Sequence, residues 1–247
     1  MPGPFCEAWP GTSGTIKLCD MKTMIRKELE KIRRENPASG SGLSLYPRLL
    51  FRLLRLCGYL LKGRWAMRSA RKAGRLVFLR GRLKLENKGT LKIGNKVRIW
   101  SSIHPSQIYV EKSAHLTVGD GCYINGAFIA VCRRVSIGKN CFLGPMAHVQ
   151  DSPFFGLDAG QAAAHAQPVI IEDDAWLAAR CTIVGGVRIG RGAVVAVGAV
   201  VVEDVPPYCV VAGNPARVVK QIRPEPLPEP HSKEASCRNK KKTLHKT

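Results

Sequence analysis

Large aliphatic residues recur at every sixth position between residues 171 and 205. A second set, of small or apolar residues, lies four places after each of them. This period is neither the 3.6 of an α-helix nor the 2 of a long flat strand. The pattern predicts short strands joined by turns, with the aliphatic side chains pointing to a common axis. The first set comprises Ile171, Leu177, Ile183, Ile189, Val195 and Val201, and the second Ala175, Cys181, Val187, Ala193, Ala199 and Val205.

Six blocks in phase predict an all-β solenoid, a parallel β-helix in which each coil buries its aliphatic face against its neighbours. Glycines and aspartates near the block ends suit tight corners, because they accept positive φ angles. Ordinary strands of an α/β domain would not keep aliphatic residues in phase over thirty positions. The same motif returns upstream, for example at 118–123 and 137–142, so the solenoid is expected over residues 76–205.

One long interruption divides the repeats. They stop at Val149 and resume at Val169, so residues 150–168 are expected to leave the coil as a loop. Loops on a rigid scaffold tend to carry function.

The flanking segments differ in composition from the repeats. Residues 1–44 are expected to be disordered apart from a short charged helix, and residues 224–247 to form a disordered basic tail. Prolines end the solenoid near 206, and a short cap helix is expected within 206–223. Residues 45–75 predict a basic amphipathic helix, in which Arg48, Arg52, Arg55 and Lys62 share one face and leucines cover the rest.

Two interpretations of that amphipathic helix remain open. It can lie in a membrane interface, with leucines among acyl chains and arginine stems reaching the headgroups. It can also cover the open end of the solenoid. No apolar stretch is long enough for a transmembrane helix, and no secretory signal is evident. We therefore expect a cytoplasmic protein with peripheral contact to an anionic inner membrane face.

Charge and cysteine usage indicate which partners and which cell compartment suit the chain. The net charge is +21, and residues 1–75 contribute 16 Lys and Arg against 5 Asp and Glu. Basic extensions suit anionic lipid or nucleic acid, but no nucleic-acid motif accompanies them. Cys122, Cys141 and Cys181 fall at the small inward position of a repeat, which predicts buried free thiols in a reducing compartment rather than disulfides. The sequence contains no C-x-x-C pair, so a zinc cluster is not expected.

Three motifs carry a family resemblance: Pro168–Ala178 with Trp176 near its end, Glu203-Asp-Val-Pro-Pro, and Val211-Ala-Gly-Asn-Pro-Ala-Arg-Val-Val-Lys. Over about residues 76–223 the chain resembles the hexapeptide-repeat acyltransferases, in particular the sugar and polysaccharide O-acetyltransferases. The resemblance implies a left-handed β-helix of triangular section, a homotrimer, and acetyl-CoA in a groove between two subunits, without a metal.

The resemblance also implies a cofactor-binding set: Ala179, Val197, Gly198, Arg217 and Lys220. Small residues let the pantetheine arm approach the backbone, and the two cations can meet phosphates. The small residues have an alternative explanation in coil packing. Glu203 stands where relatives often have lysine, and a carboxylate there would weaken phosphate binding.

Acetyl transfer to a hydroxyl needs a base, because the hydroxyl stays protonated at neutral pH. In the family a histidine follows the aspartate at the loop entrance, but here that position reads Phe154 or Phe155. The remaining candidates are His148 and His165, and for each of them a role as a surface or packing residue is the alternative. Asp151 can orient a histidine or form a turn.

The acceptor is expected to be a sugar or a cell-surface polysaccharide precursor, with Asn125 as a candidate for binding its hydroxyl groups; a solvated corner residue is the alternative for Asn125. The alternative function is a catalytically degenerate trimer that serves as a scaffold or binding module. A γ-type carbonic anhydrase is excluded, because its three zinc-binding histidines are missing from the corresponding repeat.

Overall fold

The computed structural model describes residues 45–153 and 159–222, and it divides into two units at Leu61/Lys62. The first unit contains most of helix α2 (Leu45–Ala66). The second contains the repeats, a 3₁₀ turn at Met67–Ser69, and the short helix α3 (Ala159–Ala164). No helix among the described residues is both long enough and apolar enough to cross a bilayer.

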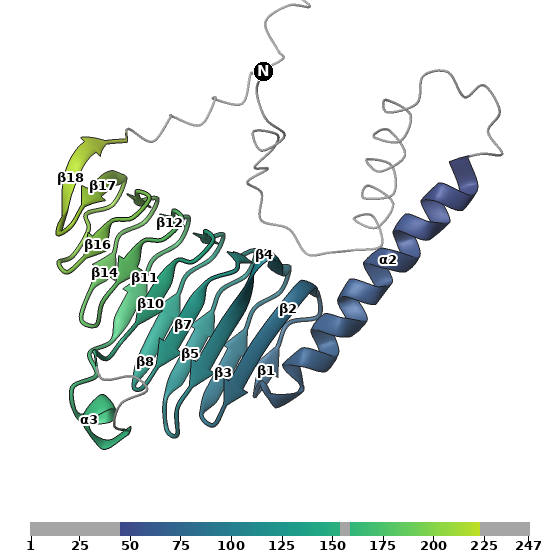
Figure 1. Cartoon of the computed structure of the whole chain (residues 1–247), viewed down its shortest axis with the longest axis horizontal. Helices are drawn as coiled ribbons and strands as arrows, with labels where there is room; N and C mark the ends of the chain where they lie inside the picture. The colour runs from purple at the N-terminus through teal and green to yellow at the C-terminus, as the bar shows by residue number, and fades with distance from the viewer. Residues whose placement is uncertain (1–44, 154–158, 223–247) are drawn as a thin grey trace, which may run out of the picture. The chain divides into compact units, whose positions relative to one another are not determined.

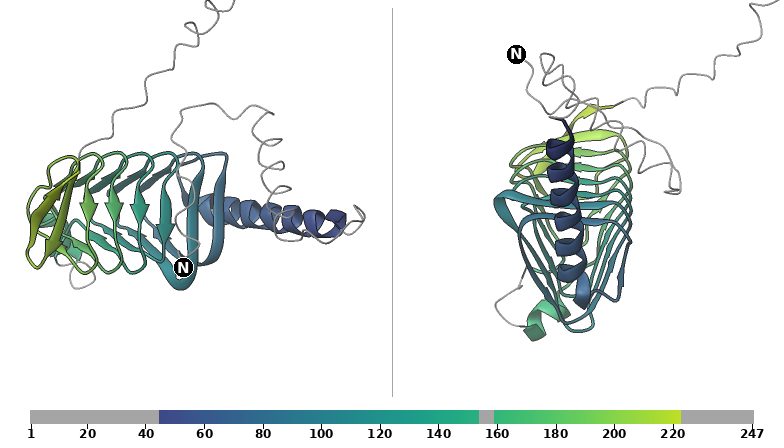
Figure 2. Two further views of the ribbon diagram at one scale, coloured as in Figure 1. Left: turned by 90° about the horizontal axis from the view of Figure 1, so that it is seen from above. Right: turned by 90° about the vertical axis from the view of Figure 1, so that its right-hand side faces the viewer.

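The repeats form a parallel β-solenoid, which confirms the predicted β-helix (Figure 1). Its coils stack so that each strand pairs with strands of the coils before and after it, and Figure 2 (right) looks along this stack. The strands form three faces. The first face consists of β1 (Lys72–Ala73), β3 (Thr90–Ile93), β5 (His115–Val118), β8 (Arg134–Ile137), β11 (Val169–Ile171) and β14 (Arg188–Ile189).

The other two faces belong to one bent sheet. Strands β2 (Val77–Asn87) and β4 (Val97–Val110) run through both faces. From β4 the second face continues as β6 (Tyr123–Asn125), β9 (Phe142–Leu143), β12 (Trp176–Leu177), β15 (Val194–Val195) and β17 (Cys209–Gly213). The third face continues as β7 (Phe128–Val131), β10 (His148–Gln150), β13 (Thr182–Ile183) and β16 (Val200–Val201).

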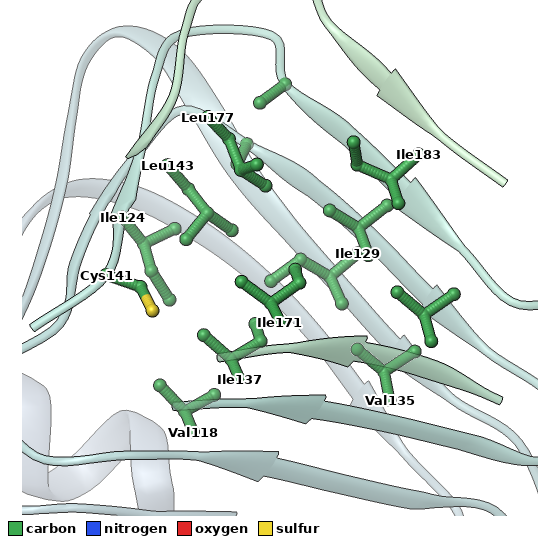
Figure 3. Close-up of a cluster of buried hydrophobic side chains, with 14 of the residues drawn as sticks. Val118, Ile124, Ile129, Val135, Ile137, Cys141, Leu143, Ile171, Leu177 and Ile183 are labelled. Carbon is green, nitrogen blue, oxygen red and sulfur yellow. The ribbon is translucent and has the colours of Figure 1, made fainter. Parts of the chain in front are cut away.

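The aliphatic positions of the repeat fill the axis of the solenoid, as predicted. In register, Leu143 pairs with Leu177 on the second face and Ile137 with Ile171 on the first. Figure 3 shows these side chains meeting inside the coils, with Cys141 among them. All six large aliphatic positions of residues 171–205 are at most 1% exposed. The three predicted inward cysteines are also fully buried and free.

The structure differs from the prediction at two expected helices. The amphipathic helix stops at Ala66 rather than 75, because Met67 turns into the core and Ala70 is extended. The short cap helix expected within 206–223 is wrong: β18 (Ala216–Gln221) folds back antiparallel on β17. The open edge of the last coil supplies backbone hydrogen-bonding groups that a strand can pair and a helix cannot.

Candidate functional site

The corner between the second and third faces gathers three of the predicted cofactor residues. Ala179 lies in the turn between β12 and β13, and Val197 and Gly198 lie in the turn one coil later. The Gly198 N–H donates to the Ala179 carbonyl at 3.1 Å, so the two turns stack directly. Val197 is 70% exposed, and a Cβ at Gly198 would meet nothing within 4 Å. This corner ridge is therefore open to a ligand along its length.

Arg217 lies at the C-terminal end of the same ridge. Ala196 donates to the Val211 carbonyl, and the next residue, Ala212, pairs with Arg217 across the β17–β18 hairpin. Arg217 Nη2 lies 3.3 Å from Glu203 Oε1, so the carboxylate that departs from the family pattern holds this guanidinium. Lys220 pairs with Val210 on the second face and is exposed.

His148 starts strand β10 and points outward on the third face, directly after the corner turn of its coil. Its N–H donates to the Cys181 carbonyl at 2.8 Å, and it pairs in register with Thr182 and Phe128. The imidazole and the Phe128 ring have centroids 4.2 Å apart. Burial lowers the pKa of His148 below its ordinary value, because water no longer solvates the charged form. The imidazole is therefore neutral at pH 7 and able to accept a proton.

Asp151 is fully buried where the chain leaves the coil. Its Oδ1 accepts the Cys132 N–H, and its Oδ2 accepts the N–H groups of Arg133 and Arg134, each at 2.7 Å. The main-chain carbonyl of Asp151 accepts the Gln167 N–H at 2.7 Å, which closes the base of the loop. Both carboxylate oxygens thus hold the turn of the preceding coil, an arrangement that favours the structural role for Asp151.

The second candidate histidine, His165, follows α3 in the loop and is exposed. Its Nδ1 lies 3.1 Å from the Gln161 carbonyl. The loop leaves the solenoid at the corner between the third and first faces, whereas His148 begins the third face at its other corner. The structure therefore does not group the two histidines at one corner. Phe154 and Phe155, where the resemblance leads one to expect a histidine, lie outside the described residues.

Asn125 ends β6 on the second face, next to a row of aromatic side chains that the sequence analysis missed. Trp100 contacts Tyr123, Tyr123 stacks on Phe142 at 5.1 Å, and Phe142 meets Trp176 edge-on at 5.7 Å. The sequence does carry a signal for this row. Tyr123, Phe142 and Trp176 each directly precede an inward aliphatic residue, and that position points outward.

Cysteine and metal chemistry have little support in the described part of the chain. Burial raises the pKa of Cys181 to about 12 and that of Cys132 to about 11, so both remain thiols at neutral pH. No group of three or more His, Cys, Asp or Glu side chains there could hold a metal ion.

Comparison with known proteins identifies the repeat. Residues 134–147 and 168–203 match the family model described as the hexapeptide repeat of succinyl-transferase. The chain is similar to the 2,3,4,5-tetrahydropyridine-2,6-dicarboxylate N-acetyltransferase of Brevibacillus brevis, with 61% identity over 57 residues, which cover 23% of this chain and 24% of that protein. The enzyme of that name from Staphylococcus aureus strain JH9 is 59% identical over 56 residues, 23% of each chain. The chain thus matches about a quarter of the length of these relatives.

A similar solved structure is that of a point mutant of AntD, an N-acyltransferase from Bacillus cereus, in complex with dTDP-4-amino-4,6-dideoxyglucose and coenzyme A. It superimposes with a TM-score of 0.53 at 17% identity, covering 66% of this chain and 89% of that one. At this identity the likeness concerns the fold. Together with the repeat match and the coil register, it shows that the chain folds as a hexapeptide-repeat β-solenoid.

Proposed function

We propose that this protein is an acetyl-CoA-dependent acetyltransferase that modifies a hydroxyl group of a sugar or of a cell-surface polysaccharide precursor. The observation that carries the proposal is the corner ridge, where Ala179, Val197, Gly198 and Arg217 follow one another along the stack. Small side chains on the ridge would let an extended pantetheine arm reach backbone groups. Arg217 at the end of the ridge and Lys220 on the adjoining second face would bind the phosphates.

The family supports acyl transfer, and the fold neighbour supports the class of acceptor. AntD is an N-acyltransferase whose structure contains a sugar nucleotide and coenzyme A. The curated relatives are N-acetyltransferases. The acceptor atom, oxygen or nitrogen, therefore has to be tested directly.

The proposed reaction needs one proton transfer. The acceptor oxygen attacks the thioester carbonyl carbon, the C–S bond breaks, and coenzyme A leaves as a thiol. The base takes the hydroxyl proton and returns it to the departing sulfur. His148 suits this role by its neutral imidazole beside the ridge, and His165 by its place on the loop. In a homotrimer, the loop 150–168 of one subunit would face the ridge of the next. We expect this trimer in the cytoplasm, with peripheral membrane contact.

The test is transfer of a radiolabelled acetyl group from acetyl-CoA to a panel of neutral, acidic and amino sugars, as nucleotide sugars and oligosaccharides. We expect an ester, which mild alkali removes, on at least one acceptor. His148→Gln or His165→Gln should lower kcat at least about 100-fold, whichever residue is the base. An alkali-stable amide would replace the hydroxyl acceptor with an amine. No transfer to any acceptor would contradict the enzymatic function.

A second candidate is a non-catalytic trimer that acts as a scaffold. It is favoured by the phenylalanines at the usual histidine position and by the engagement of Asp151 with three backbone N–H groups. Calorimetry separates the candidates, because a scaffold should show no saturable binding of acetyl-CoA.

A further inference from the structure

Helix α2 (Figure 1) presents an apolar stripe to solvent. Five large apolar side chains on it are 59–70% exposed: Leu50, Phe51, Leu54, Leu61 and Trp65. At 100° per residue these positions fall within about one quarter of the helix circumference. Clustered exposure of this size marks an interaction surface rather than scattered surface residues.

The opposite side of the last turns of α2 is the one that packs on the first coil. Met67 is 3% exposed and belongs to the core, and Gly63 lies so close to β2 that a Cβ would meet the Val77 carbonyl oxygen at 2.1 Å. Gly63 lies across the helix axis from Leu61 and Trp65. Within the second unit, the face of α2 that packs on the first coil is therefore not the face that carries Trp65.

Positive charge lines both edges of the apolar stripe. Arg55 and Lys62 follow Leu54 and Leu61 by one residue, and Arg64 precedes Trp65 by one; all three cations are exposed. The sequence from Leu45 to Ala66 contains no Asp or Glu. An apolar stripe with Arg55 and Lys62 along one edge and Arg64 at the other suits a helix that lies in the plane of an anionic bilayer surface, where each cation adds affinity.

The second unit contains a feature of the same chemistry around Trp65. An open hollow is lined by apolar groups of Trp65, Leu79, Leu83 and Pro105 and by the cations Lys62, Arg82 and Lys84. Lys62 donates one N–H to the Gly81 carbonyl at 2.8 Å, which leaves two donors of its ammonium for another acceptor. Lys84 also pairs with Glu86 at 3.4 Å. An apolar floor with cations at its rim suits the phosphate and glycerol region of a phospholipid.

We propose that the apolar stripe of α2 docks the protein on the surface of an anionic phospholipid bilayer, with Trp65 at the headgroup level beside the hollow. The proposal does not depend on acetyl transfer, since none of these residues belongs to the corner ridge. Docking would hold the enzyme close to acceptors that are attached to the membrane.

The experiment uses the full-length protein and sedimentation with vesicles of phosphatidylcholine alone or with about 30% phosphatidylglycerol. We expect binding to the anionic vesicles, at least about tenfold weaker in about 0.5 M NaCl because salt screens surface charge. Leu61→Glu should weaken binding at least about tenfold. It removes a leucine that would be buried in the bilayer, and it adds a charge that anionic lipid repels. Trp65→Phe should remove the vesicle-induced blue shift of tryptophan fluorescence.

Ile170→Glu is the matched control, because it places the same charge at an exposed apolar residue of the first face. It should bind vesicles like the wild type. Equal binding to neutral and anionic vesicles, or equal losses for both variants, would overturn the proposal. Absence of vesicle binding would also overturn the proposal. If Leu61→Glu then changed the oligomeric state, the stripe would instead bind a second copy of the chain.

Discussion

At the scale of single residues, two polar side chains of the candidate site have environments formed by residues that lie far from them in the sequence. His148 keeps a neutral imidazole because Phe128 and the strand beneath it exclude water. Arg217 is exposed, but a carboxylate holds it. Neither environment was predictable from local sequence, because Phe128 and His148 lie on different coils, and Glu203 and Arg217 are separated by the whole of β17.

Replacing His148 by phenylalanine tests the burial of the imidazole. A histidine whose folded pKa is lowered binds its proton more readily in the unfolded chain. The contribution of His148 to stability therefore falls as the pH drops below about 6.5 and is constant above it. His148→Phe preserves the ring contact and removes the titration. We expect the urea midpoint of the variant to fall less between about pH 7.5 and 5.5 than the midpoint of the wild type. Identical pH dependence in the variant and the wild type would contradict this.

Replacing Glu203 by glutamine tests whether the Arg217 guanidinium is held away from a cofactor. An exposed ion pair contributes about 0.2–1 kcal/mol, so its removal should tighten acetyl-CoA binding by up to about fivefold. Pantetheine, which lacks the phosphates, should bind both proteins equally. Unchanged acetyl-CoA affinity would show that Glu203 does not restrain a phosphate-binding group.

At the scale of elements, the repeat was predictable and its ends were not. A period of six determines which side chains enter the core, because each strand contributes inward residues at fixed spacing to a shared axis. The C-terminal segment follows Pro206 and Pro207 and has no repeat, so its pairing on β17 depends on an open strand edge that only the folded coil creates. The end of α2 likewise depends on the close approach of Gly63 to β2.

Two glycines of α2 provide a matched test of that approach. Gly63→Ala should lower the free energy of unfolding by more than about 1 kcal/mol, because its Cβ would lie 2.1 Å from the Val77 carbonyl oxygen. Gly58 has nothing within 4 Å of its Cβ position, so Gly58→Ala should have no cost and should favour the helix by up to about 1 kcal/mol. Denaturant unfolding of both variants provides the comparison. Equal effects would contradict the packing of the last turns of α2 on β2.

At the scale of the whole molecule, the solenoid is a rigid support that aligns residues from successive coils along one corner. The fold could be predicted from the sequence, since the repeat assigns each residue to a face or a corner, whereas the ridge residues were proposed from the resemblance to the hexapeptide-repeat acyltransferases. The acceptor site could not, because in the proposed trimer it would combine a loop of one subunit with the ridge of another. The outward aromatic row on the second face was visible in the sequence only once the register was known.

The central claim, that the corner ridge binds acetyl-CoA, is tested most directly by isothermal titration calorimetry of the full-length protein. We predict saturable binding that Val197→Glu weakens at least about tenfold, because the new carboxylate at this exposed ridge position would repel an anionic cofactor. Ile170→Glu, with the same charge on the first face, should bind like the wild type. Absence of saturable binding, or equal weakening by the two variants, would contradict the account.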